Sequence, residues 1–462
     1  MRRLRFQGYP NIEYSRGKEV KIHGKGVMVL IGTKFLDNIL GRNYLGYKGL
    51  TFVMIWFITV AVVEAQTLVK QTPTVAPRAL SSLGDSFFGK KAIKGWGGNL
   101  QRLEDEGISL NAQWLLEGFD NFQGGIKIGN AFASTFDLNV GLDTEKVFHW
   151  KGGKFYVDLE DHAWQDPSKD LIGDLQNFDK QNARPYFEIY ELWYRQMFLN
   201  GFLHLKLGKW NANDDFSVND NGVFFLNSSD QLTPTLLTLP TTPDTMLGSG
   251  LYLTPISWWS IKFGIFDANQ SDAFGNFAGN TQLMQPTKDG LLLIGEMDLR
   301  WSHAFFWDNE GNLKLGAWHH TGIFTRLDGS SQEGAKGFYA VFNQAIWRPR
   351  RTSQRNCGVR TFVSSGWTQS SVSVINWNLA GGLTWAGFLT APPQDVWGFS
   401  ANYAHLSLQS GRPYSYELAL EWFYYMRVSN WMAFIPDVQN IIHPGGRYAN
   451  ALVGSLDVLL QI

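Results

Sequence analysis

The sequence predicts an all-β fold, a transmembrane antiparallel β-barrel of about 16 strands that a short helix precedes. From Ile108 to the end of the chain, apolar and polar residues alternate with a period of two, which indicates strands with one apolar and one polar face. Many of these segments are longer than the strands of soluble proteins, which average about five or six residues. The chain is 15% aromatic and 18% charged at a mean hydropathy of −0.17, which excludes a disordered chain and a bundle of membrane helices.

Other counts exclude further classes of protein. The 462 residues include one Cys, so neither an internal disulfide nor a cysteine zinc site is expected. The 40 basic residues are balanced by 41 acidic ones, which leaves no basic surface for nucleic acid. We therefore expect no nucleic-acid partner.

Residues 1–65 are predicted to be a basic extension plus a signal peptide that is removed. The apolar run 50–63 has about 14 uncharged residues, fewer than the roughly 20 that a membrane-spanning helix needs. Small residues at Val63 and Ala65 suit cleavage after Ala65. The alternative is a retained anchor helix. Without residues 1–65 the chain has 30 basic and 37 acidic residues, a charge of −7.

Residues 66–107 are predicted to be a flexible lead that ends in a short helix. Thr, Pro and Ser are frequent in 66–83. Leu100 and Leu103 then have i, i+3 spacing, and Gly107 is a typical helix stop.

Residues 108–462 are predicted to be the barrel domain. In the first strand Leu110 and Trp114 lie on one face, and Asn111 lies on the other. Similar alternation follows near Phe132, Phe155, Leu203, Trp259, Leu291, Tyr416 and Leu452. The sheet should close, because an open edge in lipid would leave backbone N–H and C=O groups unpaired.

Connection lengths support a barrel with one short-looped and one long-looped end. Four connections are short, at 198–201, 255–258, 390–395 and 429–430. Two are long, at 164–185 and 211–244, and the second is the longest in the chain.

The residues also resemble the carbohydrate-selective (OprB-type) porins of Gram-negative outer membranes. The resemblance covers nearly all of residues 96–462. It is carried by Trp96-Gly97-Gly98, Leu103-Glu104, Gly107-Ile108, Gly124-Gly125, Gly141-Leu142-Asp143, Trp150-Lys151-Gly152-Gly153, Glu191–Gln196, Leu207-Gly208-Lys209, Phe216, Gly337-Phe338-Tyr339, Gln344, Ile435–Gln439 and Pro444-Gly445-Gly446. Two positions depart from the family pattern: His443 stands where Asn is usual, and Ile462 ends the chain where an aromatic residue is usual.

This resemblance implies a monomeric outer-membrane porin for passive diffusion of sugars into the periplasm. The protein would be exported by its N-terminal signal and surrounded by outer-membrane lipid. The alternatives are a non-selective or differently selective porin and, in a different class, a barrel enzyme or a structural outer-membrane protein. No Ser/His or metal-ligand motif favours an enzyme.

The predicted sugar-binding residues lie around the connection 211–244, which in general porins folds into the lumen. If Tyr190, Leu192 and Tyr194 face lipid, alternation turns the residues between and after them toward the pore. The predicted pore-lining set is Glu191, Trp193, Arg195, Lys206, Lys209, Trp210, Asp214 and Asp215. Trp193 or Trp210 would stack on a sugar, and Arg195, Lys206 and Lys209 would donate to hydroxyls. The alternatives are an aromatic girdle for both Trp and ordinary solvation for the charges.

No metal or cofactor is predicted. His319 and His320 are strand neighbours and point to opposite faces, so they cannot share an ion. The pair Asp214 and Asp215 lacks a second carboxylate at the separation that glycoside hydrolysis needs. The one weak alternative is a structural Ca²⁺ near Asn211, Asn213 and Asp215, since Ca²⁺ takes several oxygen ligands.

Overall fold

The computed structural model describes residues 99–267, 290–302, 309–349, 357–390 and 395–461. The predicted signal peptide (1–65), most of the predicted lead and the terminal Ile462 lie outside these residues. Within them sixteen strands form one closed antiparallel barrel. The strands are β1 Ile108–Gly125, β2 Gly129–Asp143, β3 Gly153–Trp164, β4 Tyr186–Phe198, β5 Leu203–Trp210, β6 Met246–Ile256, β7 Trp259–Asp267, β8 Leu291–Trp301, β9 Gly311–Thr325, β10 Ser331–Trp347, β11 Gly358–Thr368, β12 Ile375–Ala386, β13 Asp395–Leu406, β14 Tyr416–Arg427, β15 Met432–Ile442 and β16 Ala449–Gln461.

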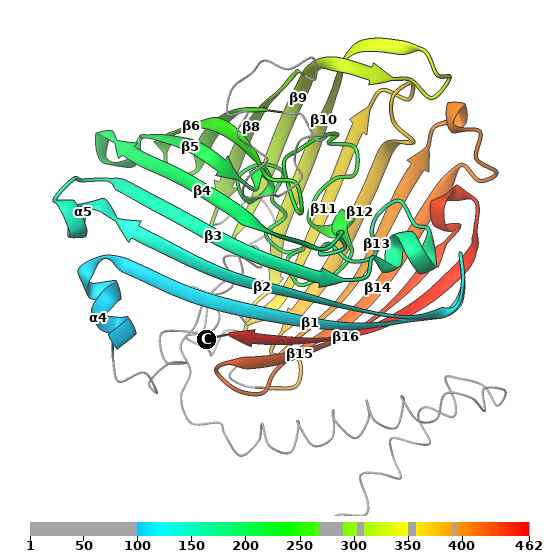
Figure 1. Ribbon diagram of the computed structural model, residues 1–462, viewed down its shortest axis with the longest axis horizontal. Helices are drawn as coiled ribbons and strands as arrows, with labels where there is room; N and C mark the ends of the chain where they lie inside the picture. The colour runs from blue at the N-terminus through cyan, green and yellow to red at the C-terminus, as the bar shows by residue number, and fades with distance from the viewer. Residues whose placement is uncertain (1–98, 268–289, 303–308, 350–356, 391–394, 462) are drawn as a thin grey trace, which may run out of the picture. The chain divides into compact units, whose positions relative to one another are not determined.

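The barrel closes where the first strand meets the last. Strand β1 pairs with β16 in antiparallel register, with Gln113 opposite Gln461 and Glu117 opposite Asp457. The blue β1 and the red β16 accordingly run side by side in Figure 1. Every strand therefore has two hydrogen-bonded neighbours, and the predicted all-β barrel is confirmed.

The predicted short helix is also present, as α4 (Asn99–Glu106). It ends at Gly107, whose φ of +100° lies in a region that glycine adopts without a Cβ penalty. Among the described residues, no helix combines the length and the apolar character needed to cross a membrane.

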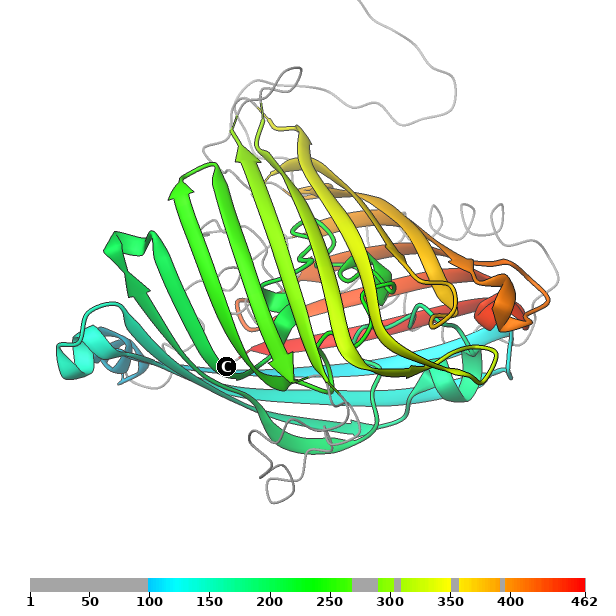
Figure 2. The same ribbon diagram turned by 90° about the horizontal axis from the view of Figure 1, so that it is seen from above.

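The alternation of the sequence separates an apolar outer face from a polar inner face. On β8, Leu291 and Leu293 are exposed on the outer face, whereas Glu296 and Asp298 are buried on the inner face. The inner charges are buried because two long connections fold into the lumen. Figures 1 and 2 both show these connections, drawn in green, inside the barrel.

One predicted orientation is wrong. Tyr190 was expected to face lipid, but it is 4% exposed and its hydroxyl lies 2.7 Å from Thr242 Oγ1 in the lumen. The register of β3 and β4 shifts at Asp158, which is opposite Glu191. The extra residue of this β-bulge lets Tyr190 and Glu191 both be buried, which strict alternation forbids.

Candidate functional site

The two connections inside the lumen are bound to each other. We call residues 165–185, between β3 and β4, the first inner loop, and residues 211–245, between β5 and β6, the second inner loop. The backbone N–H of Lys180 donates to Leu226 O at 2.8 Å, and Ser228 N–H donates to Asn177 O at 3.0 Å. The Lys180 ammonium also donates to the carbonyls of residues 223 and 225, both at 2.9 Å. The two loops are therefore joined by hydrogen bonds into one unit.

Buried carboxylates of β14 hold this unit to the barrel wall. Glu421 accepts the N–H groups of Leu226 at 2.6 Å and Asn227 at 3.0 Å. Glu417 accepts the two successive N–H groups of residues 175–176 at 2.9 and 3.0 Å. A buried N–H group left without an acceptor costs roughly 1–3 kcal/mol, so these contacts keep both loops inside.

The segment Ile435–Gln439 holds both loops as well. Gln439 Nε2 donates to Phe178 O of the first inner loop at 2.7 Å. Its Oε1 accepts from Asn227 Nδ2 of the second inner loop at 3.2 Å. This motif of the sequence is thus a docking point for the loops.

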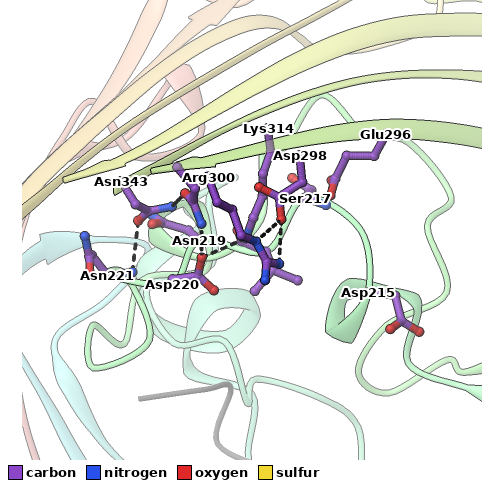
Figure 3. Close-up of polar contacts among 12 residues, drawn as sticks. Asp215, Ser217, Asn219, Asp220, Asn221, Glu296, Asp298, Arg300, Lys314 and Asn343 are labelled. Carbon is purple, nitrogen blue, oxygen red and sulfur yellow. Dashed lines mark hydrogen bonds and ion pairs between the residues drawn. The ribbon is translucent and has the colours of Figure 1, made fainter. Parts of the chain in front are cut away.

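A turn at residues 217–221 of the second inner loop lies against β8, β9 and β10 (Figure 3). Ser217 N–H donates to Glu296 Oε2 at 2.7 Å, and Asn221 N–H donates to Asn343 Oδ1 at 3.0 Å. Asp220 pairs with the Lys314 ammonium at 3.0 Å. Each contact joins a loop group to a side chain on the inner face of a strand.

Two charged side chains of this region stay open to solvent. The Arg300 side chain is 58% exposed and donates through Nε and Nη2 to the buried Asp298, at 2.8 and 2.6 Å. The Asp220 side chain is 39% exposed, although Lys314 holds it. A guanidinium and a carboxylate are therefore both available to a polar solute.

Most of the sequence-predicted site residues lie together at the start of the second inner loop. The Lys206 ammonium lies 4.6 Å from the ring centre of Trp193 and 4.8 Å from that of Trp210. It also pairs with Asp215 Oδ2 at 2.9 Å. Glu191 accepts from Trp193 Nε1 at 2.8 Å. Cation–π contacts with the two rings and the ion pair with Asp215 together fix the Lys206 ammonium in place.

Asp214 and Asp215 are neighbours with opposite electrostatics. Burial, followed by the charge of Glu191, raises the pKa of Asp214. Burial also opposes ionisation of Asp215, but the Lys206 and Lys262 ammonium groups and the Tyr252 hydroxyl together outweigh it and hold the pKa of Asp215 below its usual value. The Tyr252 hydroxyl, which donates to Asp215 at 2.9 Å, acts in the same direction.

Trp210 is too deeply buried for the predicted stacking on a sugar. The residue is 0% exposed and packs against Phe266 at a ring distance of 4.8 Å, so no face is left for a sugar. Lys209 is held by Glu188 at 3.3 Å and by Ile189 O at 2.8 Å. Trp193 and Arg195 remain partly exposed on the inner face of β4.

Sequence reasoning missed Tyr156. This residue pairs with Trp193 across β3 and β4, and the two rings stack with centres 5.0 Å apart and planes 22° apart. Tyr156 alternates onto the same face as Asp158, which the sequence shows. That it lies opposite Trp193 depends on the strand register, which the sequence does not show.

The side chains proposed for calcium have other partners. Asn211 Oδ1 accepts the N–H of Asn213 at 3.0 Å, and Asp215 is paired with Lys206. In the described part of the chain, no three His, Cys, Asp or Glu side chains are arranged to hold a metal ion. His319 is exposed and His320 is buried, so they do face opposite sides of β9.

Comparison with known proteins gives three concordant results. Residues 127–461 match the family described as "Carbohydrate-selective porin, OprB family". Porin B of Pseudomonas aeruginosa is 23% identical in an alignment 423 positions long, which covers 79% of this chain and 89% of that protein. A high-pH structure of Pseudomonas putida OprB is similar at a TM-score of 0.71, with 19% identity over 79% of this chain and 97% of that one. A low-pH structure of the same protein has a TM-score of 0.54, with 17% identity over 81% and 99%.

Proposed function

This chain belongs to the carbohydrate-selective OprB porin family, and we propose that it lets sugars diffuse passively across the outer membrane into the periplasm. The barrel lumen would be the path, and the two inner loops would narrow it. The observation that carries the proposal is the docking of both loops on buried inner-face carboxylates, Glu417 and Glu421 among them. A constriction held in this way selects solutes by size and by polar contacts.

The Tyr156–Trp193 pair supports sugars as the solute. A sugar presents an apolar C–H face that lies well against an aromatic ring and hydroxyls that need donors and acceptors. Trp193 and Arg195 are both partly exposed on the inner face of β4. This combination of ring and donors suits weak, reversible sugar contacts, which a channel requires because a tightly held solute would not leave.

The exposed Arg300 and Asp220 supply a second polar contact along the proposed path. The guanidinium can donate to one hydroxyl of a sugar, and the carboxylate can accept from another. Asp298 anchors Arg300 and Lys314 anchors Asp220, so both side chains are already fixed before a sugar binds. We infer that a sugar contacts the Tyr156–Trp193 pair and the Arg300–Asp220 pair in succession.

Planar-bilayer recording of the purified protein tests this function. We expect discrete conductance steps that glucose or an oligosaccharide reduces in a concentration-dependent way. An absence of steps would refute the channel. Steps that no sugar changes would leave a porin with a different solute, which is the alternative reading. An uncharged polyol of similar size serves as the control for simple crowding of the lumen.

A further inference from the structure

The two inner loops begin at one end of the barrel. Two other connections at that same end are hydrogen-bonded to each other. These are residues 407–415, between β13 and β14, and residues 443–448, between β15 and β16. They appear in orange and red next to each other at the right of Figure 1. Tyr414 N–H donates to Gly446 O at 3.1 Å, and the Arg412 guanidinium donates to Gly445 O.

An aromatic run lies on the outer wall beside these connections. His443 stacks on Tyr414 with ring centres 3.7 Å apart and planes 4° apart. The run continues from His443 to Tyr416 at 4.8 Å, to Tyr403 at 5.7 Å and to Trp377 at 5.6 Å. Tyr416 alternates with the lumen-facing Glu417, so this run belongs to the outer face. Such rings are favoured at the boundary between lipid tails and headgroups.

Arg412 is held in place before any ligand binds. Its side chain packs on Gly446, where a Cβ would lie 3.2 Å from Arg412 Cδ. Its Nη1 is used by Gly445 O. Nε and Nη2 make no hydrogen bond in the described part of the chain, so one edge of a rigid guanidinium is open.

Arg447 adds a second positive charge at this place. The residue is exposed and lies two positions after Gly445, whose carbonyl accepts from Arg412. Burial of Arg412 and the charge of Arg447 both lower the pKa of Arg412. In the part of the chain that the structure describes, no carboxylate lies within ion-pair distance of either guanidinium. Glu417, an acidic group whose charge acts on Arg412, already accepts the N–H groups of residues 175–176 and 445.

We propose that Arg412 and Arg447 bind the phosphate of an anionic membrane lipid whose acyl chains lie along the aromatic run from Tyr414 to Trp377. Two guanidinium groups match a phosphate in charge and in geometry. An anion bound by both guanidinium groups reduces the repulsion between them. The aromatic run adds apolar contact for the acyl chains of the lipid. A free phosphate ion would use the arginines only.

Native mass spectrometry of the whole purified protein in a non-ionic detergent tests the proposal. The probes are phosphatidylglycerol, phosphatidylcholine and inorganic phosphate. We expect an apparent Kd for phosphatidylglycerol at least ten-fold below that for phosphatidylcholine. R447Q should weaken phosphatidylglycerol binding at least five-fold, and R412Q/R447Q should abolish the preference. R326Q is the matched control, because Arg326 lies at the same end of the barrel but is held by Gln332 at 3.0 Å.

Three outcomes would overturn the proposal. They are equal affinity for the two lipids, an equal loss in R326Q, and inorganic phosphate bound as tightly as phosphatidylglycerol, which would indicate an ion site. R447Q keeps the test decisive if the double variant does not fold, since the Arg447 side chain is exposed. Sugar block of conductance is a separate readout, so failure here does not affect the proposed function.

Discussion

The carboxylate of Glu421 accepts the backbone N–H of Leu226 at 2.6 Å, across 195 positions of sequence. Both groups are buried, one on the barrel wall and the other in the second inner loop. A carboxylate in this position needs N–H donors, and the loop backbone needs acceptors once it leaves water. Each group therefore satisfies the other, and the contact holds the second inner loop against the barrel wall.

E421A should release part of the second inner loop. The variant removes the acceptor of two buried N–H groups, and each buried donor left without a partner costs roughly 1–3 kcal/mol. We expect a larger single-channel conductance with more current noise, measured in planar bilayers. E145A is the control, because Glu145 is exposed on α5 (Thr144–Phe148). Unchanged conductance in E421A would show that Glu421 does not hold the constriction.

W193A and W210A should affect different properties. Trp193 is partly exposed, so W193A should weaken sugar block several-fold while the barrel stays folded. Trp210 is fully buried, so W210A should lower the free energy of unfolding by about 3–5 kcal/mol. Sugar titration in bilayers and urea unfolding in detergent measure the two effects. The assignment fails if W210A weakens block in a fully folded barrel and W193A does not.

The ion pair of Asp215 with Lys206 should make the stability of the folded protein depend on pH. The pKa of Asp215 is lowered in the folded state, so its stabilisation is complete above the unfolded value of 3.8 and is lost as the pH falls through the lower folded value. Wild type should therefore be more stable than D215N at pH 7, and the difference should be smaller at pH 3. Thermal unfolding of both proteins at the two pH values measures this. A difference that is the same at both pH values would contradict it.

The mature protein should begin at Gln66. The apolar run 50–63 and the small residues Val63 and Ala65 predict cleavage there. N-terminal sequencing of the protein from an outer-membrane fraction checks this directly. Recovery of a chain that still contains residues 50–63 would favour the retained anchor.

The predicted pore residues show how far alternation carries an inference. It placed Glu191, Trp193 and Lys206 on the inner face, where they are found. It misplaced Tyr190, because a β-bulge inserts one residue and changes the phase of the pattern. It also could not separate Trp193 from Trp210, since burial of Trp210 depends on Phe266 of β7 and on the inner loop.

The sequence by itself determined the all-β barrel, the short helix and the inner and outer faces of most strands. These features follow from local periodicity, which requires only that one face meets lipid and the other water. Tertiary structure alone decided the Tyr156–Trp193 pair, the binding of the inner loops by Glu417, Glu421 and Gln439, and the contact of Arg412 with Gly445. Strand register and loop docking join residues far apart in the chain, and their energies depend on burial that no local pattern records.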